Sequence, residues 1–517
     1  MSSPDTHVDR RSAGYHFRHN GGLILTAIIL ASGFFMYGYD ASVISGSLAM
    51  PLFIQHFGTA TAKGYVLTAH QTSLVTAVPT VGTFLGAVII TLYSDRIGRK
   101  KIIWIACAIG VASSAIQTAA VNIVMFTVGR VFTATSCFLL QSSCATALVE
   151  MAPANIRGAV AVLGVFSIGI ALIVSSGVNW ATSTIMTDLS WRLPIGLQCL
   201  WPLLIAGGMI YVSDSPTSFL IAGEDEKAQQ SLEKVRHGYT AEEIRSELDS
   251  LKWQAALRAA ETEVPWLDLF RGVNLRRTFL ATYLAIFDLL SGLVFATFYA
   301  TVFLTQVGSS SPFELVFALD VLAIGGAILG LFLVDLVGRR VLALTTFSIL
   351  FVIDVVIGGL GFADPTSSSV IKAISAFLLM FGFFCAAGFS SLTLLSAAEF
   401  PTARLRSRTN AFSLMSGSLA SLAVIYILPY IASPNAGNLG AKTYLIFAGC
   451  MALCIVITFF CYPEVKGRTA AEIDEMFEAR LPARKFKGYI CSVSPDNLDT
   501  AMMKNVEELE IAGEQKV

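Results

Sequence analysis

The feature that most limits the fold of this chain is a series of long apolar stretches separated by short polar clusters. A helix that crosses a bilayer needs about 20 predominantly apolar residues, so twelve crossings would take roughly 240 residues of the chain. Twelve such stretches occur, near residues 21–45, 65–93, 102–120, 122–149, 158–181, 192–212, 277–307, 313–334, 341–361, 371–398, 408–432 and 442–462. Hydrophobic residues make up 55% of the 517 residues and charged residues 14%, which excludes disorder and argues against an ordinary soluble enzyme. The sequence therefore predicts an all-α membrane protein with 12 transmembrane helices.

A polar segment divides the apolar stretches into two sets of six. This segment has helical signals, because Thr240 precedes Glu243 by three residues, the spacing of a capping box. We expect it to form a solvated helical linker on one side of the membrane. The predicted organisation is a tail at 1–20, a six-helix bundle at 21–212, the linker at 213–276, a second six-helix bundle at 277–462 and a tail at 463–517.

Lys and Arg are distributed unequally between the two sets of connections. Cytoplasmic loops of membrane proteins carry an excess of these residues. With both termini in the cytoplasm, the cytoplasmic connections hold the linker and the basic clusters that follow the second, fourth, eighth and tenth stretches. We therefore expect a multi-pass protein of the plasma membrane with both termini cytoplasmic. The opposite face has only four basic residues, Lys63, Arg192, Lys372 and Lys442.

Composition and spacing also limit the partners and cofactors. The formal net charge of -1 argues against a nucleic-acid partner, which would require a basic face. The nine cysteines are scattered without a CxxC pair and the histidines are dispersed, so neither a metal site nor a disulfide framework is expected. We see no Ser/His/Asp arrangement or phosphate-binding loop, so neither an enzyme nor a cofactor is expected. The expected partners are a small-molecule solute, protons and the lipid bilayer, and the expected functional unit is a monomer.

The two sets of stretches carry the same charged motifs at equivalent places. The motif D-x-x-G-R-[RK] follows the second stretch and the eighth stretch, which separates Asp95 from Asp335 by 240 residues. Two motifs that recur in order indicate duplication of a six-helix unit, an arrangement that places a substrate site between the halves near mid-membrane. In the second motif a glutamate precedes an arginine by seven positions, after the fourth and the tenth stretch: Glu150 with Arg157, and Glu399 with Arg406.

Taken together, these residues resemble the sugar porter family of the major facilitator superfamily, over nearly the whole chain from Gly38 to Phe477. The resemblance implies two pseudo-symmetric six-helix bundles, the major facilitator fold, and secondary active transport by alternating access. The motifs that carry it are the two D-x-x-G-R-[RK] loops, Gly38-Tyr-Asp40, Gly129-Arg130, Glu150 with Arg157-Gly158, Trp191-Arg-Leu-Pro-Ile-Gly-Leu-Gln198, Ala398-Glu-Phe-Pro-Thr402 with Arg406, and Pro463-Glu-Val-Lys-Gly-Arg-Thr469.

The resemblance assigns the repeated charged motifs to a cytoplasmic gate. Carboxylate and guanidinium groups at helix ends can pair between helices and between halves, which would favour the state closed to the cytoplasm. The alternative is that these residues only direct membrane topology, because individual exposed ion pairs contribute little. The predicted gate residues are Asp95, Arg99, Glu150, Arg157, Asp335, Arg339, Glu399 and Arg406.

Asp40 and Arg130 are charged residues within apolar stretches. A charge within the membrane costs at least ~2.5 kcal/mol and generally faces a cavity or a partner. Their positions match the acid and the arginine that sugar porters use for proton coupling, so protonation of Asp40 would release Arg130. The alternative is a static buried pair that holds the first and fourth helices together. Two further acids within the membrane, Asp320 and Asp354, are expected to form hydrogen bonds between helices.

The expected substrate site departs from the sugar porter pattern. Sugar porters present Gln, Asn and Trp side chains to sugar hydroxyls, because an amide both donates and accepts and an aromatic face covers the ring. Most of these side chains are replaced here, so the site should discriminate poorly in favour of hexoses. The replacements are Val165 in the fifth helix, Asp288, Leu289 and Val294 in the seventh, Leu394 in the tenth and Gly417 in the eleventh; with Ser291 and Gln198 they form the set of substrate-cavity candidates.

Asp288 has three possible roles. It could be a second protonatable group, a partner for a cationic or hydroxylated solute, or a structural acid bonded to a neighbouring Ser or Thr.

The expected function is transport of a sugar or sugar-like small organic solute, coupled to protons through Asp40 and Arg130. One alternative is export of a less polar secondary metabolite, which the apolar replacements favour. The other is a membrane sensor that does not transport.

Overall fold

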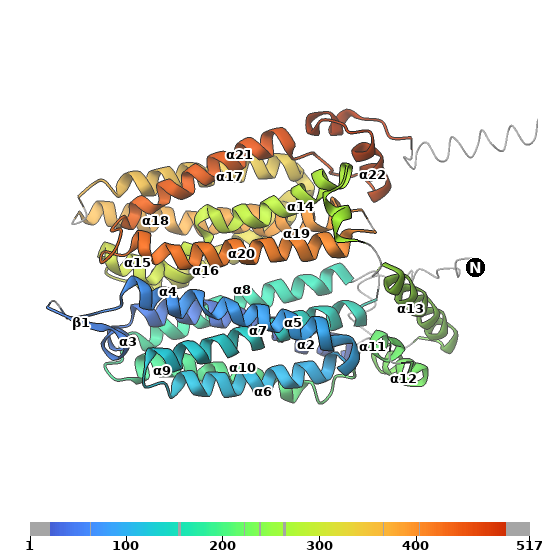
Figure 1. The fold of residues 1–517 in the computed structure, drawn as a ribbon, viewed down its shortest axis with the longest axis horizontal. Helices are drawn as coiled ribbons and strands as arrows, with labels where there is room; N and C mark the ends of the chain where they lie inside the picture. The colour runs from blue at the N-terminus through green and yellow to red at the C-terminus, as the bar shows by residue number, and fades with distance from the viewer. Residues whose placement is uncertain are drawn as a thin grey trace, which may run out of the picture.

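The computed structural model describes residues 21–62, 64–153, 157–221, 223–236, 239–261, 265–364, 367–402 and 404–492. It is almost entirely helical, and twelve helices of these residues are long and apolar enough to cross a membrane. Figure 1 shows two neighbouring bundles, one of the blue to cyan helices of the N-terminal half and the other of the yellow to red helices of the C-terminal half. The predicted fold class is therefore confirmed.

The six spans of the N-terminal half run from α2 to α10. A proline begins α5, where its missing N–H is tolerated, and Pro194 lies inside α9, whose span continues through a short 3-10 turn. The spans are α2 (Gly21–Ala49), α4 (Ala69–Ala77) with α5 (Pro79–Ile97), α6 (Arg99–Thr118), α7 (Ile123–Met151), α8 (Arg157–Thr182), and α9 (Leu189–Gly196) with η1 (Leu197–Cys199) and α10 (Leu200–Gly208).

The six spans of the C-terminal half run from α14 to α21. Two of them contain π-helical turns, named η3, η4 and η5. The spans are α14 (Val273–Asp288) with η3 (Leu289–Leu293), η4 (Phe295–Tyr299) and α15 (Ala300–Val307), then α16 (Pro312–Val337), α17 (Arg339–Leu360), α18 (Ser368–Cys385) with η5 (Ala386–Ser390) and α19 (Ser391–Glu399), α20 (Arg406–Ala432), and η6 (Gly440–Thr443) with α21 (Tyr444–Cys461).

The seventh span is interrupted where the sequence predicts one helix over 277–307. Regular α-helix ends at Asp288, and the π-helical turns η3 and η4 follow before α15 begins. Gly292 has a φ of 101°, a conformation that glycine adopts readily because it has no Cβ. The interruption lies at the predicted substrate positions of this helix.

The two ends of the molecule carry different structures (Figure 1). We name the end with the antiparallel hairpin the hairpin end and the opposite end the linker end. The hairpin consists of β1 (Thr59–Thr61) and β2 (Gly64–Val66), and is preceded by α3 (Pro51–Phe57). The linker end carries α11 (Pro216–Ile221), α12 (Asp225–Val235), α13 (Ala241–Glu261), η2 (Trp266–Phe270), α22 (Ala470–Glu478) and η7 (Ala483–Gly488).

The predicted capping box in the linker is confirmed. The backbone N–H of Thr240 donates to Glu243 Oε2 at 2.8 Å, and the backbone N–H of Glu243 donates to Thr240 Oγ1 at 3.3 Å. These bonds satisfy N–H groups that the first turn of α13 would leave without a partner.

Each half encloses an apolar core of its own. Leu139 and Trp191 are completely buried in the N-terminal half, as are Phe381, Phe389 and Tyr444 in the C-terminal half. The cluster of the C-terminal half also includes Ala77 of α4, so apolar packing continues between the two halves.

Candidate functional site

A buried ion pair joins α2 to α7 in the N-terminal half. Arg130 Nη1 donates to Asp40 Oδ1 at 2.5 Å, and Gln198 Nε2 donates to the same oxygen at 2.9 Å. Only 9% of Asp40 and 2% of Arg130 is exposed. A buried ion pair is stable only when further hydrogen bonds satisfy its remaining polar atoms, and Gln198 supplies one of them. The sequence predicts Gln198 as a substrate-cavity residue, and the structure places it against the acid of this pair.

The close approach of α2 to α8 positions Asp40. A Cβ at Gly38 would lie 2.4 Å from the backbone oxygen of Ile168, so this contact requires glycine. Next to it, Ser175 Oγ donates to the backbone oxygen of Tyr39 at 3.0 Å. The motif Gly38-Tyr39-Asp40 therefore combines a packing requirement with the acid of the buried pair.

At the linker end, predicted gate residues form ion pairs within each half. Arg99 lies 3.5 Å from Glu150 in the N-terminal half, and Arg339 lies 3.1 Å from Glu399 in the C-terminal half. Arg339 also lies 3.2 Å from Asp335. In both halves the arginine of the loop motif therefore reaches the glutamate at the end of the fourth or tenth span.

The pairing of glutamate with the arginine seven residues later is a separate expectation. Glu399 contacts Arg339, while the side chain of Arg406 is exposed. The side chains of Asp95 and Arg157 lie outside the part of the chain that the structure describes. The pair of Glu150 with Arg157 and the role of Asp95 therefore stay predictions.

Two acidic residues that the sequence analysis did not assign to the gate lie at the starts of α6 and α17. The backbone N–H of Lys100 donates to Asp214 Oδ1 at 3.3 Å. The backbone N–H groups of Arg339 and Arg340 each donate to one oxygen of Glu464 at 3.0 Å. A carboxylate at this position satisfies unpaired N–H groups and interacts favourably with the helix dipole. Asp214 and Glu464 follow the sixth and twelfth spans, so the internal repeat was the signal that could have found them.

The same contacts explain the glycine of each D-x-x-G-R motif. Gly98 has a φ of 89° and Gly338 a φ of 103°, values that side chains rarely permit. A Cβ at either position would also lie 2.6 Å from a carboxylate oxygen, that of Asp214 at Gly98 and that of Glu464 at Gly338. The motif thus positions an arginine for the ion pair and leaves room for the capping acid.

In the seventh span, Asp288 lies beside Ser291 and Cys385. Ser291 Oγ donates to the backbone oxygen of Asp288 at 2.6 Å, which satisfies a carbonyl next to the interruption. Cys385 Sγ lies 3.9 Å from both Asp288 Oδ1 and Ser291 Oγ. The structure therefore brings two of the predicted cavity residues together with a cysteine of the tenth span.

The other predicted cavity residues have different surroundings. Val294 is buried in the core of the C-terminal half, Leu289 packs against that core, and Gly417 is also buried. Val165 is 41% exposed and Leu394 is 60% exposed. Of the positions predicted for the substrate cavity, Val294 and Leu289 therefore belong to the apolar packing, and Val165 and Leu394 lie at exposed positions.

The two remaining acids within the membrane spans, Asp320 and Asp354, are both buried. Ser176 on α8 donates to backbone oxygens of its own helix, and Asp320 Oδ2 has no partner in the described part of the chain, so the bond expected between helices stays a prediction for Asp320. The same expectation for Asp354 is wrong for the part of the chain described, because this residue is fully buried and neither carboxyl oxygen has a hydrogen-bond partner there.

Hydrogen bonds between neutral groups join the two halves at the hairpin end. The hydroxyls of Thr76 and Tyr299 lie 2.7 Å apart, and those of Ser45 and Thr301 lie 3.2 Å apart. The hairpin end is therefore closed, by a network that sequence analysis did not predict. Two further bonds to backbone oxygens cross between the halves, from Ser73 to Tyr426 at 2.9 Å and from Asn435 to Leu67 at 3.1 Å.

Comparison with known proteins gives the family. Residues 25–477 match the family described as sugar (and other) transporter. The chain belongs to this family. Among its relatives, the high glucose sensor RGT2 of Saccharomyces cerevisiae is 28% identical over 471 residues, which cover 89% of this chain but only 61% of the sensor. The major facilitator-type transporter ecdD of Aspergillus rugulosus is 28% identical over 472 residues, which cover 88% of this chain and 87% of that transporter.

The solved structures show the same fold. The inward-open xylose transporter XylE of E. coli has a TM-score of 0.71 at 18% sequence identity, and the match covers 87% of this chain and 99% of that chain. The predicted resemblance to the sugar porters is therefore confirmed by the family match, and the predicted major facilitator fold is confirmed by the solved structures.

Proposed function

We propose that this member of the sugar transporter family moves a sugar or sugar-like small organic solute by alternating access, coupled to protons. The observation that carries the proposal is the buried contact of Asp40 with Arg130 and Gln198. When the acid of a buried ion pair takes up a proton, the pair as a whole gains a net positive charge. Such a change favours one arrangement of the helices over another.

The coupling step follows from the charges of the pair. While Asp40 is ionised, one of its oxygens accepts from both Arg130 and Gln198. Protonation would leave the guanidinium of Arg130 as a buried charge without a counter-ion, which is costly. The protonated state would therefore favour a conformation in which Arg130 reaches water or another acceptor. The difference in proton affinity between the two conformations would link proton movement to solute movement.

The test replaces Asp40 in purified protein reconstituted into proteoliposomes. Asp40→Asn should abolish accumulation of solute against its gradient under an imposed pH gradient, while exchange of solute across the membrane persists. Asp188→Asn is the control, because Asp188 lies 3.6 Å from Arg192 in an exposed pair. The coupling role is wrong if Asp40→Asn accumulates solute as well as the unmodified protein does.

The proposal also includes an orientation. The linker end would face the cytoplasm of a plasma-membrane protein that acts as a monomer, because the basic residues gather at that end. With the hairpin end closed, this structure would be an inward-facing conformation, which the similarity to inward-open XylE supports. The pairs of Arg99 with Glu150 and of Arg339 with Glu399 would then hold helix ends together within each half while that end is open.

Export of a less polar metabolite is the second candidate function. It is favoured by the apolar side chains at Val165, Leu289, Val294 and Leu394, where sugar porters have groups that bind hydroxyls. A counterflow panel of hexoses, polyols, organic acids and hydrophobic metabolites separates the candidates. Exchange of hexoses or polyols supports the first function, and exchange of hydrophobic metabolites alone supports the second. If no solute on the panel exchanges, both are wrong and a sensor that does not transport becomes the better description.

A further inference from the structure

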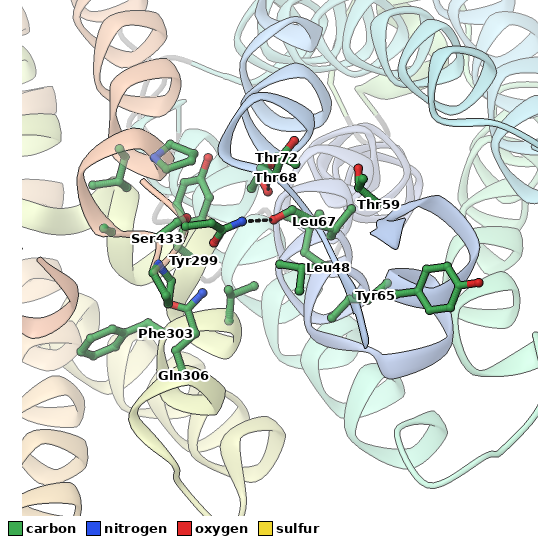
Figure 2. Close-up of a pocket in the computed structure, with 18 of the residues that line it drawn as sticks. Leu48, Thr59, Tyr65, Leu67, Thr68, Thr72, Tyr299, Phe303, Gln306 and Ser433 are labelled. Carbon is green, nitrogen blue, oxygen red and sulfur yellow. Dashed lines mark hydrogen bonds between the residues drawn. The ribbon is translucent and has the colours of Figure 1, made fainter. Parts of the chain in front are cut away.

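A cavity of about 700 Å³ lies between the two halves at the hairpin end (Figure 2). Leu48 and Thr72 of the N-terminal half line it on one side, and Phe295, Tyr299 and Phe303 of the C-terminal half line it on the other. It contains none of the substrate positions predicted from the sequence. It is therefore a different space from the site assigned to the transported solute.

The hairpin and one hydrogen bond between the halves border this cavity. Thr59 and Thr61 of β1 line it, whereas Ala60 between them does not, as expected for a strand whose successive side chains point to opposite faces. Asn435 Nδ2 donates to the backbone oxygen of Leu67 at 3.1 Å, and Figure 2 shows this bond between the two groups of side chains. The cavity is thus assembled from parts of both halves at the end where they are joined.

The side chains that line the cavity favour an uncharged ligand over a charged one. The described residues that line the cavity include no Asp, Glu, Lys, Arg or His. An ion would exchange its hydration there for neutral groups, which is unfavourable. The half-buried side chains of Leu67 and Val302 offer apolar surface, and Gln306 and Asn435 offer amides that can both donate and accept. A volume of this size suits a drug-sized molecule.

We propose that this cavity binds an uncharged amphipathic molecule, with an apolar body and one or two hydrogen-bonding groups, that enters from the hairpin end. Its apolar part packs against Leu67 and Val302, and its polar group bonds to Gln306 or Asn435. Because its walls come from both halves, the ligand binds the conformation closed at the hairpin end better than the open one. By linkage it holds the protein in that closed conformation.

The binding test uses the protein in nanodiscs and two fluorescent probes with closely related rings. N-phenyl-1-naphthylamine is uncharged, and 8-anilinonaphthalene-1-sulfonate carries a sulfonate. After subtraction of empty nanodiscs, the uncharged probe should bind saturably at one site per protein, and the anionic probe at least tenfold more weakly. Equal binding of the two probes, or no saturable binding of the uncharged probe, overturns the proposal.

Matched variants place the probe in the cavity. Ala62→Trp adds a large ring to a lining residue and should weaken binding of the uncharged probe at least tenfold. Ala60→Trp adds the same ring to a residue of the same hairpin that does not line the cavity, and should leave binding unchanged. Gln306→Leu removes one amide without filling space and should weaken binding severalfold. If all three variants bind the probe as the unmodified protein does, the site is wrong, whatever the protein transports.

A second measurement tests the conformational consequence. Cysteines replacing Ser45 and Thr301, whose hydroxyls lie 3.2 Å apart across the halves and which do not line the cavity, would join the halves when the hairpin end is closed. Saturating uncharged probe should raise the rate of this cross-link. The same probe should not change the rate when Ala62→Trp is also present. A cross-link that slows when the probe is added would show that the ligand prefers the open conformation.

Discussion

At the scale of single residues, glycines next to carboxylates are the positions where a small change should have a large effect. Gly98 and Gly338 combine a positive φ with a carboxylate oxygen where a Cβ would stand. Each glycine allows an acid from a later segment, Asp214 or Glu464, to reach the first N–H groups of a helix. The repeated motif therefore connects distant segments of one half, and it also supplies charged residues for the ion pairs.

Gly338→Ala should destabilise the C-terminal half, because the backbone conformation costs a residue with a Cβ about 1–3 kcal/mol. The expected result is a lower thermal unfolding temperature of the purified protein. Gly359→Ala, within the helix α17 that Gly338 precedes, is the control, since no atom of a neighbouring segment lies within 4 Å of the added Cβ. That change should be neutral or slightly stabilising. An equal effect of the two changes would contradict the explanation of the motif.

At the scale of elements, the short helix α22 is held to the C-terminal half by charged and aromatic contacts. Arg277 at the start of the seventh span pairs with Asp474, and its guanidinium lies 4.6 Å from the ring centre of Phe477. The backbone N–H of Thr469 donates to Glu472 Oε2 at 2.8 Å, which completes a capping box at the start of the helix. The stability of α22 therefore depends on the ionisation of the Glu472 carboxylate.

Acidification should loosen α22. Hydrogen bonds from the backbone of Thr469 lower the pKa of Glu472 below its usual value. A lowered pKa means that the stabilisation is fully present above the unfolded value of about 4.3 and is lost as the pH falls through the folded value. We expect the free energy of local unfolding of α22 to fall by about 1 kcal/mol. This corresponds to roughly fivefold less protection of residues 470–478 from hydrogen exchange, after correction for intrinsic rates. In Glu472→Gln this pH dependence should disappear, and its persistence there would assign the effect to another group.

At the scale of the whole molecule, closure of the hairpin end rests on hydrogen bonds between neutral groups that come from different halves. Such bonds each contribute about 0.5–1.5 kcal/mol, so they can hold the closed state without making it permanent. The ion pairs described at the linker end lie within the halves, and so they do not oppose separation of the two halves there. This division fits a molecule whose two halves rock against each other.

Tyr299→Phe should shift the population away from the state closed at the hairpin end, because it removes a hydroxyl that bonds to Thr76 and to the backbone of Ile425. A shift of up to about tenfold is expected for the loss of ~1.4 kcal/mol. Spin-label distances between the hairpin ends of α4 and α20 measure the two populations. Tyr283→Phe is the control, because its hydroxyl bonds to Thr458 within the C-terminal half. The same distance distribution in both variants would contradict this account of closure.

The spans, the internal repeat and the buried pair of Asp40 with Arg130 could be predicted from the sequence. Burial in lipid depends on local composition, and a charge inside an apolar stretch must find a partner. The interruption at Gly292 could not be predicted in the same way, because a glycine within an apolar helix is compatible with a straight span until its neighbours are known. The hydrogen bonds of Gln198 and of Tyr299 depend on segments far apart in the chain.

The sequence by itself determined a chain of twelve membrane helices, duplicated as two halves, with most of its charge at one end. These properties follow from residue types counted along the chain, because the bilayer selects for apolar length. Only the tertiary structure decided which partner each polar group takes: Glu399 with Arg339, Glu464 with the start of α17, and Tyr299 with Thr76. Those choices depend on which side chains from distant segments come within hydrogen-bond distance when the halves pack. The long apolar stretches thus specify the scaffold, and contacts between them specify its conformation and its sites.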